Sequence, residues 1–211
     1  MARVWLFDLD NTLHDASAHI FPHINRSMRD YIERHLAVDQ AEATRIRQHY
    51  WARYGATLLG LVRHHGTDPR HFLEQTHQFD RLDRMVVFDR ALAATLRKLP
   101  GRKIVFSNAP RQYTAAVLDI LGVRHHFDAV WPIERLDFVP KPLPRAFRRL
   151  LRGEGLRPGQ CVFVDDSPAN LRAGKALGMK TVLISRLLRV PAYVDVRLES
   201  VIDLPRVIGR L

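Results

Sequence analysis

Residues 3–13 read RVWLFDLDNTL. Four consecutive apolar residues follow Arg3, and such a run is typical of a parallel β-strand that is buried on both faces of a sheet. Asp8 and Asp10 come directly after the run. Because ligands of open α/β sheets bind just beyond the carboxyl ends of the strands, the two carboxylates are candidate functional groups. With one residue between them, both side chains can lie on the same side of the chain.

Two carboxylates in one confined place repel each other unless a cation neutralises them or one of them stays protonated. Mg²⁺ prefers oxygen ligands and accepts substrate phosphates in its remaining coordination positions. A partly protonated carboxyl can act as a general acid and then as a base. Taken alone, Asp8 and Asp10 fit equally well an Asp-Asn turn with a solvated pair of aspartates.

Beyond residue 87, short apolar runs alternate with helical segments, several of which begin at a proline or stop at a glycine. This alternation predicts right-handed crossovers and an α/β fold with a doubly wound parallel sheet. Residues 200–202 fit either an edge strand or the start of a last helix. The expected strands are 103–106, 127–131, 162–164 and 181–184, and the expected helices are 90–99, 110–121, 142–152 and 168–177.

Residues 15–87, between the first strand and this alternating part, show four helical segments and no convincing strand. The first segment, 20–36, has apolar residues at the i, i+4, i+7, i+8 spacing of an amphipathic helix. Asp39 and Asp68 stand where helix N-caps are expected. The chain is therefore divided into a sheet-containing core of residues 1–14 and 88–211 and an all-helical insertion of residues 15–87.

The composition, with 46% hydrophobic and 26% charged residues, is that of a folded globular protein. The single cysteine, Cys161, excludes an intramolecular disulfide, and no signal-peptide pattern or long apolar stretch is present, which predicts a cytoplasmic protein without a membrane partner. The net charge of +11 is spread along the chain. It favours attraction of small anionic substrates over a stable nucleic-acid partner.

Polar residues of particular kinds follow the later strands or precede the later helices: Ser107 with Asn108, then Lys141, then Asp165 with Asp166. Each group alone also fits an ordinary helix start. Gathered at one edge of a sheet, they supply carboxylates for a metal, a hydroxyl and amides for anion oxygens, and one ammonium. Phosphoryl transfer requires such a set.

These residues match the four motifs of the haloacid dehalogenase (HAD) superfamily, and the chain resembles the phosphatases of that superfamily. The Asp-x-Asp-x-Thr motif corresponds to residues 8–12, the second motif to Ser107, the third to Lys141 and the acidic fourth motif to residues 165–170. The resemblance extends over residues 4–184, and a helical cap inserted after the first motif also fits it. It implies a HAD-like core.

The resemblance implies a role for each matching residue. Asp8 would attack phosphorus and form an aspartyl-phosphate, and Asp10 would serve as general acid for the leaving group and then as base for water. Ser107 and the backbone amide of Asn108 would hold phosphate oxygens, and Lys141 would neutralise them. Because the dehalogenases of the superfamily lack the second aspartate of the first motif, Asp10 disfavours carbon–halogen cleavage.

The same resemblance implies Mg²⁺ as cofactor. Its ligands would be the Asp8 carboxylate, the backbone carbonyl of Asp10 and the Asp166 carboxylate, with Asp165 supporting directly or through water. The partner would be a small phosphorylated metabolite, bound by a monomer or a homodimer.

A narrower resemblance concerns the substrate. The segment YWARYG, residues 50–55, is similar to the cap of the pyrimidine 5′-nucleotidases of this superfamily. Tyr50 and Tyr54 are therefore candidate substrate-binding residues that would stack a nucleobase, unless these rings only pack the cap's own small core. The prediction is a Mg²⁺-dependent phosphomonoesterase for UMP or CMP. The alternatives are a phosphatase for a sugar phosphate or phosphoglycolate, and a basic nucleic-acid-binding protein that keeps the fold without catalysis.

Overall fold

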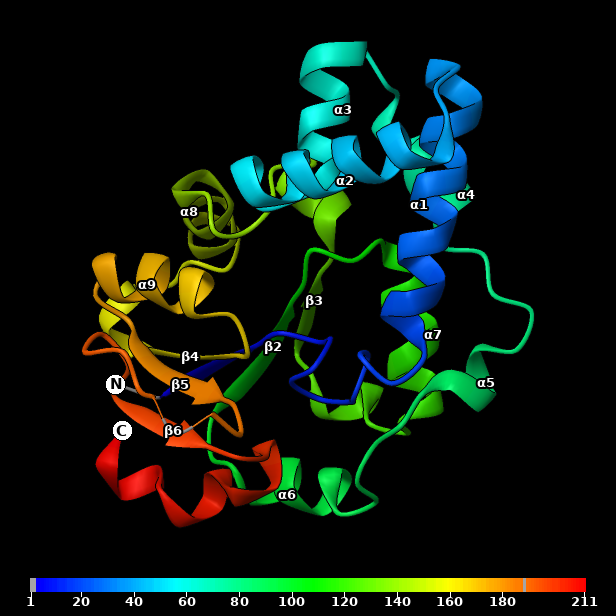
Figure 1. The fold of residues 1–211 in the computed structure, drawn as a ribbon. Coiled ribbons are helices and arrows are strands. Elements are labelled where there is room, and N and C mark those ends of the chain that lie inside the picture. Colours follow the sequence, from blue (N-terminus) through cyan, green and yellow to red (C-terminus); the bar gives the residue numbers. More distant parts are fainter. Residues whose placement is uncertain (1–2, 188) are drawn as a thin grey trace.

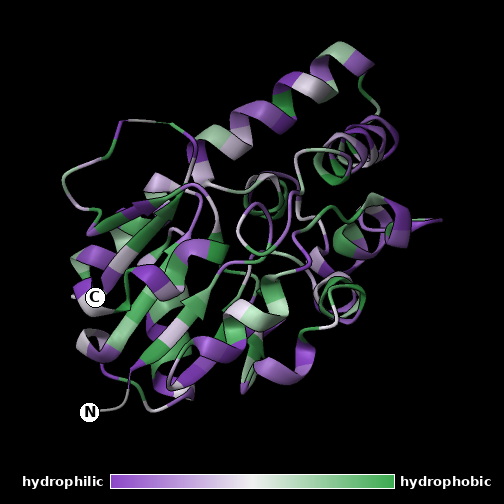
Figure 2. Cartoon of the chain, turned by 90° about the horizontal axis from the view of Figure 1, so that it is seen from below, coloured by the Kyte–Doolittle hydropathy of each residue, from purple (hydrophilic) through white to green (hydrophobic). Residues whose placement is uncertain are grey.

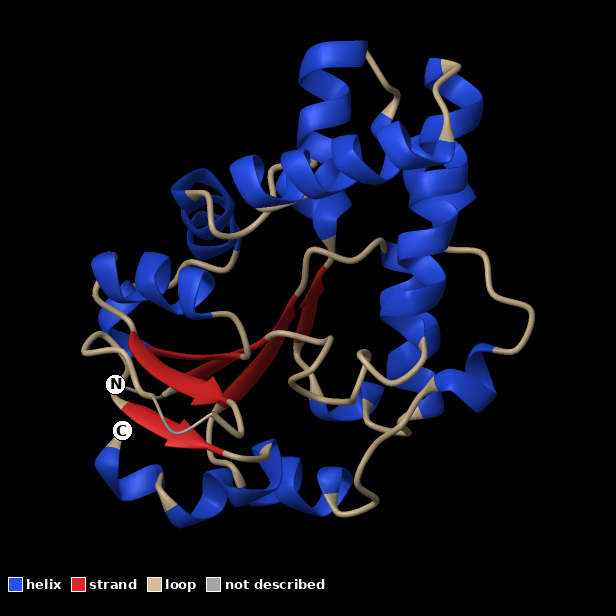
Figure 3. Ribbon diagram, in the orientation of Figure 1, coloured by secondary structure: helices blue, strands red, loops and turns tan. Residues whose placement is uncertain are grey.

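A computed structural model of the chain describes residues 3–187 and 189–211. Its centre is a six-stranded sheet in the order β3-β2-β1-β4-β5-β6, and every pair of neighbouring strands is parallel (Figure 1, Figure 3). The predicted α/β parallel sheet is confirmed. The strands are β1 (Val4–Phe7), β2 (Arg102–Phe106), β3 (Ala129–Trp131), β4 (Cys161–Asp165), β5 (Lys180–Ile184) and β6 (Val196–Leu198).

Strand β1 is buried on both faces, as its apolar sequence predicts. Val4 and Leu6 belong to one hydrophobic cluster, whereas Trp5 and Phe7 belong to another, because side chains alternate along a strand. In Figure 2 the strands and the inner faces of the helices are largely hydrophobic, and polar residues lie on the outer faces. The first cluster includes residues of α8 (Pro144–Gly153) and α9 (Pro168–Ala176), and the second includes residues of α6 (Leu92–Lys98) and α7 (Arg111–Ile120).

The register of the central strands brings their carboxyl ends together. Phe7 of β1 lies opposite Val105 of β2 and Val164 of β4. The residue after Phe7, Asp8, donates its backbone N–H to the oxygen of Val164 at 2.9 Å, which extends the β1–β4 pairing by one residue. Asp8 and Asp165 therefore reach the same edge of the sheet.

Helices beyond this edge form the inserted segment, which lies above the sheet in Figure 1. The Asp39 carboxylate accepts the Glu42 N–H at 2.8 Å, as expected for an N-cap. Where the segment leaves and rejoins the sheet, Asp15 and Val87 form an antiparallel bridge. The helices of this segment are α1 (Ile20–Leu36), α2 (Gln40–Tyr54), α3 (Thr57–His65) and α4 (Pro69–Thr76), followed by the single turn α5 (Leu82–Met85).

The helix expected from Pro142 begins instead at Pro144. The backbone of Lys141 bonds on both sides to the Asn108 side chain, so this part of the chain remains a loop. At the carboxyl end of the chain, the helical alternative is correct, since η4 (Val201–Arg206) is a 3₁₀ helix. The edge strand β6 lies earlier and is only three residues long, too short for a recognisable apolar period. Among the described residues, no helix has the length and apolar character needed to cross a bilayer.

Candidate active site

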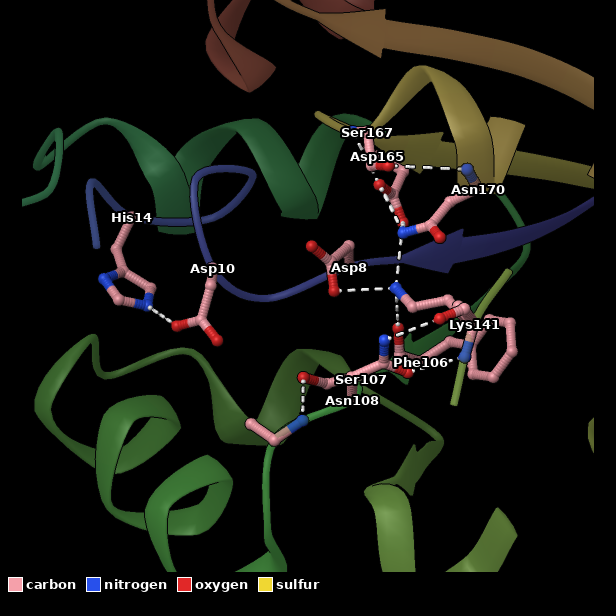
Figure 4. Close-up of polar contacts among 11 residues, drawn as sticks. Asp8, Asp10, His14, Phe106, Ser107, Asn108, Lys141, Asp165, Ser167 and Asn170 are labelled. Carbon is pink, nitrogen blue, oxygen red and sulfur yellow. Dashed lines mark hydrogen bonds and ion pairs between the residues drawn. The ribbon is translucent and has the colours of Figure 1, made fainter. Parts of the chain in front are cut away.

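Lys141 is the centre of a polar cluster at the carboxyl edge of the sheet (Figure 4). Its ammonium donates to Asp8 Oδ1 at 2.8 Å, to Asp165 Oδ2 at 2.8 Å and to the carbonyl oxygen of Phe106 at 2.7 Å. Lys141 is 1% exposed, and hydrogen bonds between charged groups are strong in such a water-poor environment. The structure thus brings together four residues that are far apart in the sequence.

The cluster shifts the pKa values of its members. Burial raises the pKa of Asp8 well above its ordinary value; the Lys141 ammonium opposes this rise, and the like charge of Asp165 adds to it. Burial alone would lower the pKa of Lys141, but the carboxylates of Asp165 and Asp8 raise it above its ordinary value. The lysine therefore stays charged while several carboxylates compete for one cation.

The two aspartates of the acidic pair differ in their surroundings. Asp165 is fully buried, and its oxygens accept hydrogen bonds from the Ser167 amide at 2.8 Å, from the Asn170 side chain at 3.0 and 3.1 Å and from Lys141. Asp166 is less buried and lines the cavity above the sheet. Burial, reinforced by the charge of Asp165, raises the pKa of Asp166 to about 7. Asp165 is thus held by several donors of the protein, whereas Asp166 lines the cavity.

The carboxylates of Asp8, Asp165 and Asp166 offer oxygen atoms that all lie within 4.8 Å of one another. Lys141 supplies one positive charge for these three acidic groups, so negative charge is in excess. A set made only of carboxylate oxygens suits a hard divalent cation such as Mg²⁺. The residues present therefore fit the metal that the sequence predicted.

Asp10 lies beside the cluster and is held by two donors. Its Oδ1 accepts a hydrogen bond from the Tyr113 hydroxyl at 2.6 Å and lies 3.0 Å from Nε2 of His14 (Figure 4 shows the latter). Burial, together with the Asp10 charge, raises the pKa of Tyr113, so the phenol keeps its proton and donates it. With Oδ1 engaged by these donors, Oδ2 is the oxygen that remains to carry a proton.

The two polar residues after β2, Ser107 and Asn108, make different contacts. The Ser107 hydroxyl, almost fully buried, accepts the backbone N–H of Ala109 at 3.0 Å and lines the cavity. The Asn108 side chain is engaged with the backbone of Lys141: its amide donates to the carbonyl at 3.0 Å and its oxygen accepts the N–H at 2.8 Å. Asn108 therefore positions Lys141, and only its backbone amide is left for an anion.

A cavity of about 690 Å³ opens above these residues, between the sheet edge and the inserted helices. Trp51 lines it, but Tyr50 and Tyr54 do not. The hydroxyl of Tyr50 pairs with His65 at 2.8 Å, and the ring is buried. Tyr54 pairs with His64 at 2.7 Å. The prediction that these two tyrosines contact substrate gains no support, because both rings pack within the cap.

Sequence reasoning gave no role to Tyr113 or His14, and it placed Asn170 in the fourth motif without a role of its own. His14 stands four residues after Asp10, which was a usable signal for a contact between them. Tyr113 carried no such signal, since an aromatic residue in an amphipathic helix is as readily explained by packing. Tyr113 lies 103 residues from Asp10 along the chain, and only the fold brings the two side chains together.

Fold and site together are those of a hydrolase built on an α/β sheet with a buried carboxylate–lysine cluster. The sequence matches the model of the haloacid dehalogenase-like hydrolases over residues 2–178. The chain belongs to this family, as the four motifs indicated.

Several known proteins are similar to the chain. "Phosphate metabolism protein 8" of Saccharomyces cerevisiae is 27% identical over 198 residues, which cover 86% of this chain and 61% of the yeast protein. N-acylneuraminate-9-phosphatase of Mus musculus is 29% identical over 66% of this chain and 60% of its own length. The chain thus spans less than two thirds of these two relatives. Phosphoglycolate phosphatase of Aquifex aeolicus is 25% identical over 86% of this chain and 84% of that protein.

Solved structures share the fold at low sequence identity. A HAD phosphatase from Thermococcus onnurineus superimposes with a TM-score of 0.69 at 21% identity, covering 98% of both chains. L-2-haloacid dehalogenase from Xanthobacter autotrophicus gives a TM-score of 0.64 at 19% identity, covering 99% of both chains. At this identity the likeness extends to the fold alone, and both phosphatases and dehalogenases use it.

Proposed function

We propose that the protein is a Mg²⁺-dependent phosphomonoesterase that works through an aspartyl-phosphate on Asp8. One observation carries the proposal: Asp8, Lys141 and the acidic pair meet at the floor of the cavity, with Asp10 beside them and held by two donors. Dehalogenation needs no acid for the leaving group, because a halide leaves without a proton. A positioned Asp10 therefore favours phosphate esters.

In this mechanism Lys141 holds Oδ1 of Asp8. The other oxygen, Oδ2, attacks phosphorus, and the bond between phosphorus and the leaving oxygen breaks. Asp10 gives the proton on its Oδ2 to that leaving oxygen. Water then gives a proton to Asp10 and attacks phosphorus, the Asp8–phosphorus bond breaks, and inorganic phosphate is released.

The Asp8 and Asp166 carboxylates and the backbone carbonyl of Asp10 would hold Mg²⁺, and Asp165 would keep Lys141 and the neighbouring loop in place. When bound, the cation supplies positive charge that the phosphate and the carboxylates share. Ser107 and the backbone amide of Asn108 would bind phosphate oxygens.

For the substrate we propose a nucleoside monophosphate, with pyrimidines preferred. The cavity, at about 690 Å³, lies in the size range of sites for drug-sized ligands, and a glycolate leaving group would fill little of it. In the segment 50–55, Trp51 is the aromatic residue that lines the cavity, whereas Tyr50 and Tyr54 do not line it. A second candidate is phosphoglycolate, favoured by the coverage of the Aquifex aeolicus relative.

Phosphate release from UMP, CMP, phosphoglycolate and sugar phosphates, with and without Mg²⁺, tests the proposal. The expected result is Mg²⁺-dependent release that is highest with the pyrimidine nucleotides and lost in Asp8→Asn. Trp51→Ala should raise KM for UMP about 5- to 100-fold if the indole stacks the base. Phosphate release from phosphoglycolate alone would make phosphoglycolate the substrate in place of the nucleotide. Full activity of Asp8→Asn would overturn the mechanism.

A further inference from the structure

His77 lines the cavity at the point where the inserted helices meet the core. It follows the last residue of α4 and is packed against Tyr113, with the two rings 5.8 Å apart at 64°. Tyr113 also bonds to Asp10, so the imidazole lies in the neighbourhood of the general acid. The adjoining chain is fixed as well, since His23 hydrogen-bonds the carbonyl of Gln78 at 2.7 Å.

The hydrogen-bond network assigns the tautomer of His77. Its Nδ1 lies 3.2 Å from the carbonyl oxygen of Leu73 and 3.0 Å from the Thr76 hydroxyl. The Thr76 hydroxyl donates its own proton to the carbonyl of Phe72 at 2.7 Å, so toward His77 it can only accept. Both neighbours of Nδ1 are acceptors, and Nδ1 therefore carries the proton.

The ring is also neutral. Burial lowers the pKa of His77 to about 4, although Asp10 and the Leu73 carbonyl act in the opposite direction. A neutral imidazole with its proton on Nδ1 has a lone pair on Nε2. Among the described residues, Nε2 of His77 has no hydrogen-bond partner. The atom is not fully buried, so a ligand can reach it. His77 lines the cavity, which is therefore the open space next to this lone pair.

We propose that Nε2 of His77 accepts a hydrogen bond from a hydroxyl or N–H group of the leaving group, so that the enzyme selects phosphomonoesters that carry a donor near the ester oxygen. This inference rests on the proposed phosphomonoesterase function. It makes His77 a specificity-determining residue rather than a catalytic one: an ester without the donor covers the lone pair without pairing it, which costs binding.

The kinetic test compares esters that differ by one donor: 2′-deoxyuridine against 2′,3′-dideoxyuridine 5′-monophosphate, and 2-hydroxypropyl phosphate against propyl phosphate. For each pair the wild-type kcat/KM should be about 10- to 100-fold higher for the ester with the hydroxyl. In His77→Leu this ratio should fall to near one, and His77→Gln, which keeps an acceptor, should restore part of it. His125→Leu, at an exposed histidine outside the cavity, should keep the wild-type ratio.

The ratio separates the proposal from a merely structural role, because a misfolded site lowers kcat/KM for both members of a pair equally. Nitrogen NMR of the wild-type protein provides a readout without turnover: Nδ1 of His77 should be protonated and Nε2 unprotonated. The inference is overturned if the wild-type enzyme releases phosphate with a kcat/KM ratio near one for each pair of esters, or if a proton is found on Nε2. Either result leaves the phosphomonoesterase function standing. Failure to hydrolyse any phosphomonoester would instead overturn that function.

Discussion

Replacing Lys141 with methionine removes the ammonium while keeping most of the side-chain volume. The variant leaves Asp8 and Asp165 facing each other, and Asp166 nearby, without their buried cation. Breaking a buried ion pair by removing one partner costs about 3–5 kcal/mol, since the remaining charge stays uncompensated. We expect a loss of this size in the free energy of unfolding when Mg²⁺ is chelated.

Urea unfolding followed by circular dichroism measures this loss, which corresponds to a midpoint about 1–2 M lower than that of the wild type. Added Mg²⁺ should recover part of it, because a second cation then shares the same carboxylates. Phosphate release should be abolished in either condition, as Asp8 loses the group that holds its Oδ1.

Lys175→Met is the matched control. Lys175 pairs with Asp195 at 2.7 Å, much as Lys141 does with its partners, but its side chain is 37% exposed against 1% for Lys141. Exposed pairs contribute about 0–1 kcal/mol, so this variant should unfold close to the wild type. Equal losses in the two variants, or a loss below about 1 kcal/mol for Lys141→Met, would mean that burial does not decide the cost of removing the ammonium.

Three further predictions follow from the same geometry. Tyr113→Phe removes a donor to Asp10, so kcat for UMP should fall about tenfold with little change in KM; unchanged kcat would mean that Asp10 is positioned without it. Gly60→Ala places a Cβ 2.1 Å from Cγ of Tyr50, and this clash should outweigh the better helix propensity of alanine, lowering stability in urea by about 1–3 kcal/mol; a stabilised variant would contradict the packing. The pKa of Asp166 is raised to about 7, so protons compete with Mg²⁺ for this carboxylate near neutral pH. The rise in Tm on adding Mg²⁺ should therefore be smaller at about pH 6 than at about pH 8. An equal rise at both pH values would mean that Asp166 is not a ligand.

The fold could be predicted largely from local sequence patterns. An apolar run such as Val4–Phe7 fits few places except a sheet buried on both sides, and the alternation of strands with helices leaves a parallel sheet as the simplest arrangement. Errors occurred where the local pattern was weak or overruled. Pro142 looked like a helix start, but the hydrogen bonds between the Asn108 side chain and the Lys141 backbone keep this part of the chain in a loop.

Local segments were enough to name the residues that could perform the chemistry, because the spacing of Asp8 and Asp10 and the polar residues after the later strands can be recognised one segment at a time. The contacts of each group, in contrast, depend on the folded chain. Tyr113 holds Asp10 from a distance of 103 residues along the chain, and Trp51 faces the cavity while its two tyrosine neighbours do not. The physical reason is that hydrogen bonds, desolvation and pKa shifts depend on neighbours in space, which separate segments supply only after the chain has folded.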